Sequence, residues 1–322
     1  MLSSLNRQLV RIPARPQFHR LLSAVASNRF ADSVPAGRIE SLAVIGAGQM
    51  GTSIAYTAAK KGGVNVFLTD VNQDALDRAQ NQLDRMLDRE VVQKKISPMQ
   101  AFEIRSMVNP TLSFESIIPE VDMVIESVSE IPQLKREIFG KLGSLAAPDT
   151  ILATNTSSIS ISLLAAAAGT KAADRVIATH FIHPVATSPT CEVARALHTS
   201  DVTFNKTMEF MRKLGKDAVV ATDTPGFIAN RLLIPFINEA IGSLETGVAS
   251  VEDIDKVMQM GYHMPMGPLR LADSIGLDTC LYIMKVLYND TGDSKYRPSV
   301  RLGRMVDAGY LGQKSGKGFY DY

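Results

Sequence analysis

A histidine and a glutamate twelve residues apart form the pair in this sequence best suited to move a proton. His180 follows the apolar segment 176–179, and Glu192 comes after a turn that contains Pro184 and Pro189. This spacing is too long for one face of a helix, but it suits two neighbouring strand ends that a loop brings side by side. A carboxylate beside an imidazole selects one tautomer and raises the basicity of the ring. The pair could therefore act as a general base toward a hydroxyl group.

A glycine-rich turn between two apolar segments is the second candidate for chemistry. Residues 42–45 predict a buried strand that runs into the turn 46–51, and an alanine-rich, helix-like segment follows. A second apolar segment, residues 64–69, ends at Asp70. Glycine-rich turns alone are common, but the order strand, glycines, helix, strand and acid is typical of a dinucleotide site.

Each glycine of this turn has a separate expected function. Gly46 suits the tight turn, Gly48 allows the backbone to approach a pyrophosphate, and Gly51 lets the helix pack on the strand. Gln49 and Met50 open the helix, whose free N–H groups and partial positive charge favour phosphate. We expect all five residues to bind the cofactor.

Asp70 indicates which dinucleotide is bound. A carboxylate at this position accepts hydrogen bonds from the ribose diol but repels a 2′-phosphate, which normally requires a nearby arginine. Residues 71–73 are Val-Asn-Gln, and the first basic residue after Asp70 is Arg78. The sequence therefore favours NAD over NADP.

The elements that must position these residues alternate between strand and helix from residue 40 onward. We expect an α/β fold of the Rossmann type, with a doubly wound parallel sheet and a ligand site at the carboxyl ends of its strands. Polar residues that follow predicted strands include Glu126, Glu130 and the stretch 155–158. Further strands are expected at 123–125, 150–153 and 176–179. One helix is expected at 74–94 and another from Ser97-Pro98 to about 107. The side chains of the first helix that should face inward are Leu76, Leu83, Leu87 and Val91.

The pattern becomes helical after about residue 222. We expect a leader and linker over 1–37, an NAD-binding domain over 38–222, and an all-α domain for substrate binding and dimerisation over 223–322. Gly and Pro residues separate the predicted helices, and Ser250 suits a helix N-cap. The helices are expected at 227–245, 251–260, 268–287 and 299–308.

Composition excludes several classes of function. The 322 residues carry a net charge of +1, which gives no reason to expect nucleic acid as a partner. No apolar run reaches the roughly 18 residues of a membrane span. Cys191 and Cys280 form neither a disulfide framework nor a metal-ligand cluster, so we expect two buried thiols and no metal.

The N-terminal 31 residues contain arginines and serines but no acidic residue. This composition is typical of a mitochondrial transit peptide, and the missing apolar core argues against a secretory signal. The simpler alternative is a basic tail. We expect a protein of the mitochondrial matrix. The arginines are Arg7, Arg11, Arg15, Arg20 and Arg29.

Six motifs in one order extend this interpretation. They occupy residues 46–51, 155–158, 180–184, 223–231, 265–268 and 312–320. With these motifs, residues 40–322 resemble the 3-hydroxyacyl-CoA dehydrogenase family, and its short 3-hydroxybutyryl-CoA dehydrogenase branch in particular. The resemblance implies NAD-dependent interconversion of (S)-3-hydroxyacyl-CoA and 3-ketoacyl-CoA, in β-oxidation or butanoate metabolism, by a homodimer.

The resemblance also implies roles for single residues. His180 matches the catalytic base and Glu192 its partner carboxylate. Ser157 matches a residue near the substrate oxygen and the nicotinamide, and Asn230 matches an amide donor to the acyl-CoA oxygens. Further NAD-contacting positions are matched by Glu130, Lys135, His183 and Lys314.

Three positions depart from the family pattern. His183 stands where the family usually has Asn, residues 188–191 replace a usual apolar stretch, and Met86 replaces a serine that contacts CoA. Two alternatives therefore stand beside the main hypothesis. One is a related dehydrogenase of hydroxy acids or sugar acids, and the other is a catalytically silent NAD(H)-binding protein.

Overall fold

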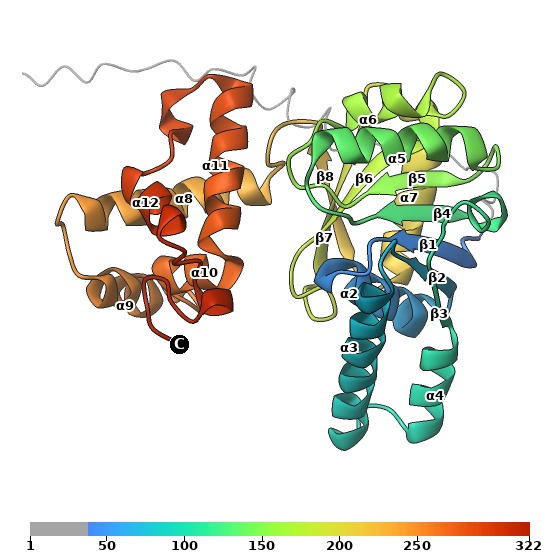
Figure 1. Ribbon diagram of the computed structural model, residues 1–322, viewed down its shortest axis with the longest axis horizontal. Helices are drawn as coiled ribbons and strands as arrows, with labels where there is room; N and C mark the ends of the chain where they lie inside the picture. Colours follow the sequence, from blue (N-terminus) through green and yellow to red (C-terminus); the bar gives the residue numbers. More distant parts are fainter. Residues whose placement is uncertain (1–37) are drawn as a thin grey trace, which may run out of the picture. The chain divides into compact units, whose positions relative to one another are not determined.

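An eight-stranded sheet forms the centre of the part of the chain that the sequence predicts to bind NAD (Figure 1). The structure is a computed structural model that describes residues 38–322, so the predicted transit peptide lies outside the described residues. The strand order is β3-β2-β1-β4-β5-β6-β7-β8. The strands are β1 Ser41–Ile45, β2 Asn65–Thr69, β3 Val108–Thr111, β4 Met123–Glu126, β5 Ile151–Thr154, β6 Val176–Phe181, β7 Thr190–Arg195 and β8 Asp217–Thr222.

Strands β1 to β6 are parallel, which confirms the predicted Rossmann-type sheet. Strand β7 departs from the predicted all-parallel pattern because it runs antiparallel to β6, and β8 is parallel to β7. Only residues 182–189 connect β6 to β7, and a parallel connection needs a crossover of about a dozen residues or more. The short loop therefore turns the chain back on itself.

Helices cover both faces of this sheet (Figure 1). One core cluster joins α3 and α7 to side chains such as Val44 and Ile125, and a second joins α5 and α6 to Ala43 and Val124. Burial on both faces explains why these strands are apolar at nearly every position. The helices are α2 Gln49–Thr57, α3 Gln73–Val92, α4 Pro98–Ser106, α5 Pro132–Leu145, α6 Ile161–Ala168 and α7 Asp201–Lys213, with a π-helical segment at Ala58–Gly62.

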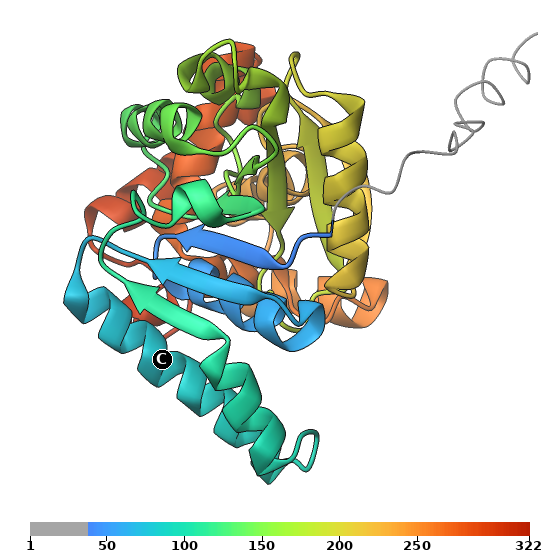
Figure 2. The ribbon, with the colours of Figure 1, turned by 90° about the vertical axis from the view of Figure 1, so that its right-hand side faces the viewer.

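Helices α3 and α4 lie side by side beyond the β3 edge of the sheet (Figure 2). As predicted, Ser97 caps α4, where its hydroxyl accepts from the N–H of Gln100 in a capping box, and Pro98 is the first helical residue. Leu76, Leu83 and Leu87 of α3 are buried as predicted, whereas Val91 is half-buried and Ala79 takes the fourth buried place.

The C-terminal part of the chain is helical, as predicted. Its helices share a core of mainly Ile and Leu side chains. The helix predicted over 268–287 is wrong in one respect, because Gly276, with φ at +103°, divides it into two. The predicted domain bounds stay predictions. The helices are α8 Ala229–Glu245, α9 Val251–Tyr262, α10 Pro268–Ile275, α11 Leu277–Thr291 and α12 Val300–Asp307, and 3-10 turns cover Ile118–Glu120, Ala173–Arg175, Ser294–Tyr296 and Gln313–Ser315.

Two further expectations concern membrane-spanning helices and the two cysteines. Within residues 38–322, no helix combines the length and apolar character that a membrane crossing requires. Cys191 and Cys280 are both buried free thiols, as predicted.

Candidate active site

His180 and Glu192 lie directly opposite each other in the antiparallel pair β6–β7. The Nδ1 atom of His180 is 2.6 Å from Oε2 of Glu192, and only 9% and 3% of the two residues are exposed. The short loop that reverses the chain thus produces the side-by-side arrangement that the spacing predicted. We call these two residues the dyad.

The second carboxylate oxygen of Glu192 connects the dyad to helix α8. Oε1 accepts hydrogen bonds from the N–H groups of Ile228 and Ala229, at 2.8 and 2.9 Å. Burial opposes ionisation of this carboxyl, but His180 and the two backbone donors outweigh it and hold the pKa of Glu192 below its usual value. Because an ionised carboxylate only accepts hydrogen bonds, Nδ1 of His180 carries a proton, and in the neutral form of the ring Nε2 has the lone pair.

Helix α8 begins beside this dyad, and two more residues lie at or just before its start. Asn230 lies in the first turn of α8, one residue after the N–H groups that Glu192 accepts. The ring of Phe227 lies 5.8 Å from the imidazole of His180, at an angle of 51°. Phe227 has φ at +45°, a conformation that a bulky residue adopts only where its surroundings enforce it. Sequence reasoning missed Phe227, although it lies inside the motif 223–231.

The turn that carries Ser157 follows β5, the strand next to β6. Asn155 fixes this turn to the dyad strand, because its Oδ1 accepts from the N–H of Phe181 at 2.9 Å. The N–H of Ser157 donates to the carboxylate of Glu130 at 3.0 Å. The structure thus brings the sequence-predicted residues Ser157 and Glu130 together.

Lys135 forms ion pairs with two carboxylates beneath this turn. Its Nζ lies 3.0 Å from Glu126 and 2.9 Å from Glu130, and the lysine is 1% exposed. Burial alone would lower the pKa of Lys135, but the two carboxylates outweigh it and raise that pKa above its usual value. We call these three residues the Glu130 cluster.

Lys216 holds the loop 182–189, which joins the strands β6 and β7 of the dyad. The buried ammonium of Lys216 donates to the backbone carbonyls of Val185 and Ser188. Burial lowers the pKa of this lysine. His183, predicted to contact NAD, is exposed in the same loop. Lys216 was not predicted, since a lysine in a polar stretch normally indicates a solvated side chain.

The glycine turn has the geometry that its sequence predicted. A Cβ added at Gly46 would lie 2.6 Å from the carbonyl oxygen of Ser127, and one added at Gly51 would lie 1.9 Å from the carbonyl oxygen of Gly46. At Gly48, by contrast, no atom lies within 4 Å of the added Cβ. Packing therefore requires Gly46 and Gly51, whereas Gly48 leaves open space above the backbone.

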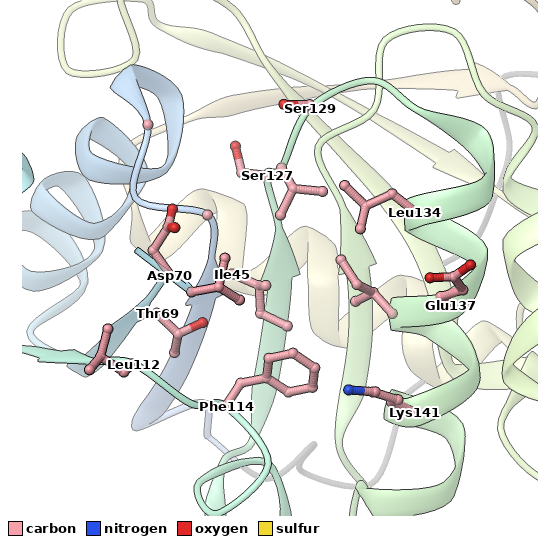
Figure 3. A pocket seen from close by; sticks show the side chains of 15 residues that line it. Ile45, Thr69, Asp70, Leu112, Phe114, Ser127, Ser129, Leu134, Glu137 and Lys141 are labelled. Atoms are coloured by element: carbon pink, nitrogen blue, oxygen red, sulfur yellow. The ribbon is translucent and has the colours of Figure 1, made fainter. Parts of the chain in front are cut away.

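Asp70 is one of the residues that line a cavity beside this turn (Figure 3). Its carboxylate accepts from the N–H groups of Ala47 and Asn72, at 2.9 and 3.1 Å. The cavity has a volume of about 440 Å³, and its lining is mostly apolar. Phe114 and Leu134 are two of the apolar side chains that line it (Figure 3). The other lining side chains that sequence reasoning did not identify include Leu112, Ile138 and Lys141.

The remaining predicted cofactor residues lie in two places. Gln49 and Met50 open helix α2 directly after Gly48, where Gln49 is exposed and Met50 half-buried. Lys314 lies in the helical part of the chain and pairs with Asp278 at 2.6 Å. No contact described within residues 38–322 joins Lys314 to the dyad or to the glycine turn.

Comparison with known proteins decides the family. Residues 41–224 match the model of the 3-hydroxyacyl-CoA dehydrogenase NAD-binding domain, and residues 226–322 match that of the C-terminal domain. The chain belongs to the 3-hydroxyacyl-CoA dehydrogenase family. It is accordingly an NAD-dependent oxidoreductase, as the resemblance in the sequence implied.

Individual relatives agree with this assignment. The chain is 45% identical over 284 residues to a 3-hydroxybutyryl-CoA dehydrogenase of Bradyrhizobium diazoefficiens, covering 88% of this chain and 96% of the relative. It is 39% identical to the mitochondrial hydroxyacyl-coenzyme A dehydrogenase of Rattus norvegicus, covering 88% and 91%. The solved structure of (S)-3-hydroxybutyryl-CoA dehydrogenase from Ralstonia eutropha matches with a TM-score of 0.83 at 39% identity, covering 88% and 99%.

The residues around the cavity fit NAD. Gly48 leaves room for a pyrophosphate above the start of α2, and Asp70 presents a carboxylate suited to a ribose diol. The hydroxyl of Thr69 is buried, lines the cavity and has no hydrogen-bond partner among the described residues. When bound, NAD supplies the nicotinamide ring that exchanges a hydride with the substrate.

Proposed function

We propose that this enzyme interconverts short-chain (S)-3-hydroxyacyl-CoA, above all 3-hydroxybutyryl-CoA, and the corresponding 3-ketoacyl-CoA. The observation that carries the proposal is the dyad, with Nδ1 of His180 2.6 Å from Oε2 of Glu192. The names of the bacterial relatives, 3-hydroxybutyryl-CoA dehydrogenases, support the short-chain substrate. An intact base with its carboxylate also argues against a catalytically silent NAD(H)-binding protein.

His180 takes the proton of the substrate hydroxyl during oxidation. Its Nε2 has the free lone pair, because the bond to Glu192 keeps the proton on Nδ1. The imidazolium that forms is stabilised by the adjacent ionised carboxylate. During reduction of the keto group, His180 returns this proton to the oxygen.

Ser157 and Asn230 orient the substrate through neutral donors. A hydroxyl and an amide can each donate to an acyl-CoA oxygen without competing with His180 for the proton. Ser157 lies on the turn after β5, and Asn230 lies in the first turn of α8. The two residues thus come from two different elements.

The proposal includes a cellular setting and an assembly. We place the enzyme in the mitochondrial matrix, in β-oxidation or butanoate metabolism, which the arginine-rich, acid-free N-terminus and the mitochondrial rat relative support. We also propose a homodimer formed through the helical part. The exposed apolar side chains of Leu232, Met260 and Tyr262 support this assembly.

Rates with a series of substrates test the proposed specificity. The kcat/KM values for NADH-dependent reduction of C4 to C16 3-ketoacyl-CoA should be highest near C4. The decline should be graded, since each methylene is worth about 0.8 kcal/mol in an apolar pocket. A maximum at C10 or longer would overturn the short-chain proposal. In the oxidative direction, faster NAD+-dependent oxidation of hydroxy acids or sugar acids than of 3-hydroxybutyryl-CoA would favour that alternative instead.

A further inference from the structure

Asp223, the first residue of the motif 223–231, binds the start of helix α6 with both of its carboxylate oxygens. Oδ1 accepts from the N–H of Ile161 at 2.9 Å, and Oδ2 accepts from the N–H of Ser162 at 2.9 Å. The hydroxyl of Ser160, the N-cap of α6, also donates to Oδ2, at 3.2 Å. The first N–H groups of a helix have no partner within the helix and carry partial positive charge, so a carboxylate stabilises them. Asp223 thus fixes the start of α6 from a segment that lies far along the sequence.

The helix start that this carboxylate binds comes directly after the turn that carries Ser157. Only three residues separate Ser157 from Ile161, the first residue of α6. The N–H groups of Ser158 and Ile159 both donate to the hydroxyl of Thr156, at 3.3 and 3.0 Å. These local bonds hold the chain between the turn and the helix in one conformation. A shift of the start of α6 would therefore move Ser157 as well.

In the other direction along the chain, Asp223 begins the segment that leads to Asn230. Two residues of this segment have positive φ, Gly226 at +76° and Phe227 at +45°. The N–H of Asn230 donates to the carbonyl of Gly226 at 3.1 Å. The N–H of Phe227 donates to the carbonyl of Thr224 at 3.0 Å. The segment is folded on itself by these bonds, so Asp223 and Asn230 are held in a fixed relation.

A second route connects the same two substrate donors through the dyad. Asn155 binds the turn to strand β6, and Glu192 binds the N–H groups at the start of α8. Asp223 connects the Ser157 turn to the segment before Asn230 without passing through the dyad. The two routes together form a closed circuit of contacts around the dyad.

We propose that Asp223 is a positioning residue, which holds the Ser157 turn and Asn230 at the separation that the substrate oxygens require. The proposal rests on the functions proposed for Ser157 and Asn230. Among the hydrogen bonds and ion pairs described for residues 38–322, none joins Asp223 to His180 or Glu192. Its effect on the rate therefore passes through the residues that it holds.

Two replacements of Asp223 that differ in severity test the proposal. Asp223→Ala removes every contact of the carboxylate, whereas Asp223→Asn keeps one oxygen as an acceptor. Asp217→Ala is the matched control, because Asp217 is an exposed carboxylate of strand β8, which ends one residue before Asp223. Ser157→Ala, alone and combined with Asp223→Asn, completes a double-mutant cycle.

Each protein is assayed at a temperature well below the lowest Tm of the series. The measurements are kcat of acetoacetyl-CoA reduction at saturating NADH, Kd of NADH by fluorescence without acyl substrate, and Tm. If Asp223→Ala does not fold, Asp223→Asn and its cycle with Ser157→Ala carry the test.

The positioning role predicts that Asp223→Ala lowers kcat by about 10²-fold, because a small misplacement of groups that orient the substrate is costly. Asp223→Asn should lie between Asp223→Ala and wild type, and Asp217→Ala within about twofold of wild type. The Kd of NADH should stay within about twofold in every variant. The double variant should be slower than the slower single variant by at most about twofold, because a hydroxyl that has been removed can no longer be misplaced.

Four results would overturn the proposal. The first is a wild-type kcat in both Asp223 variants with only a lower Tm, as a purely structural contact requires. The second is a double variant in which the two losses in kcat multiply. The third is normal turnover by Ser157→Ala beside slow turnover by Asp223→Asn. The fourth is a Kd of NADH weakened about tenfold or more while kcat at saturation equals that of wild type. Failure of the proposed function is distinguishable, since wild type and Asp217→Ala would then both fail to reduce acetoacetyl-CoA.

Discussion

Glu192 makes contact with the catalytic base and with a helix at the same time. One of its oxygens lies 2.6 Å from His180, and the other caps the start of α8. Replacing this carboxylate therefore removes one negative charge that both stabilises the imidazolium and accepts from two backbone N–H groups. Both consequences can be measured separately.

Glu192→Gln should make the stability of the enzyme less dependent on acid. The folded-state pKa of Glu192 lies below its usual value, so the unfolded chain binds the proton more readily. The carboxylate thus contributes stability above its usual pKa, and that contribution is lost as pH falls through the folded-state pKa. Denaturant unfolding between pH 6 and pH 3 should show a smaller loss of unfolding free energy in the variant. Equal losses in wild type and variant would contradict this expectation.

Asp70→Ala should change the choice of cofactor. Asp70 lines the cavity, no basic residue occurs among 71–73, and a carboxylate disfavours a 2′-phosphate. The variant should bind NADH more weakly and discriminate less against NADPH. Fluorescence titration with both cofactors measures this, with Asp77→Ala on the exposed face of α3 as the control. A wild-type enzyme that prefers NADPH would show the interpretation of Asp70 to be wrong.

At the scale of elements, the sequence predicted the central strands because burial on both faces makes them continuously apolar. Strand β3 was missed, since it has four residues and contains Pro110, which a strand tolerates only at an edge. Strand β8 was not predicted although residues 218–221 are apolar; it is the other edge strand of the sheet, and its Val219 and Val220 are exposed. The break at Gly276 was missed because the apolar pattern continues through it.

The candidate site could be predicted only in part from the sequence. The dyad was predictable, since a single loop joins its two strands and the spacing is short. The contacts of Glu130 were not, because residues 130 and 156–158 come from separate strand-to-helix connections whose approach depends on how the strands pair. Phe227 has no chemical group that would have singled it out.

Substitution by alanine should destabilise the fold at Gly51 but hardly change its stability at Gly48. Gly51→Ala places a methyl group 1.9 Å from a backbone oxygen, so it should cost about 1–3 kcal/mol of unfolding free energy. Gly48→Ala meets no atom within 4 Å, so it should change stability by less than about 0.5 kcal/mol while weakening NADH binding. Denaturant unfolding and NADH titration on both variants check this pair. Equal stability of the two variants would contradict the packing described for Gly51.

At the scale of the whole molecule, the helical part exposes apolar side chains that a second copy could cover. Leu232 of α8 is 68% exposed and Met260 of α9 is 69% exposed. We expect a homodimer, which static light scattering on protein lacking residues 1–37 would report as twice the mass of the shortened chain. Leu232→Asp should shift that mass toward the monomer, with Val92→Asp at the exposed end of α3 as the matched control. A wild-type mass equal to one chain would reject the dimer.

The dyad is the centre of this account, and one comparison tests it most directly. The initial rate of NADH oxidation with acetoacetyl-CoA is measured for wild type and for His180→Gln, together with the Kd of NADH for each. We predict rapid turnover by wild type and a loss in His180→Gln of roughly 10²–10⁴-fold, the usual contribution of a general acid and base. The Kd of NADH should remain within about twofold. A His180→Gln enzyme that turns over acetoacetyl-CoA at the wild-type rate would contradict the account.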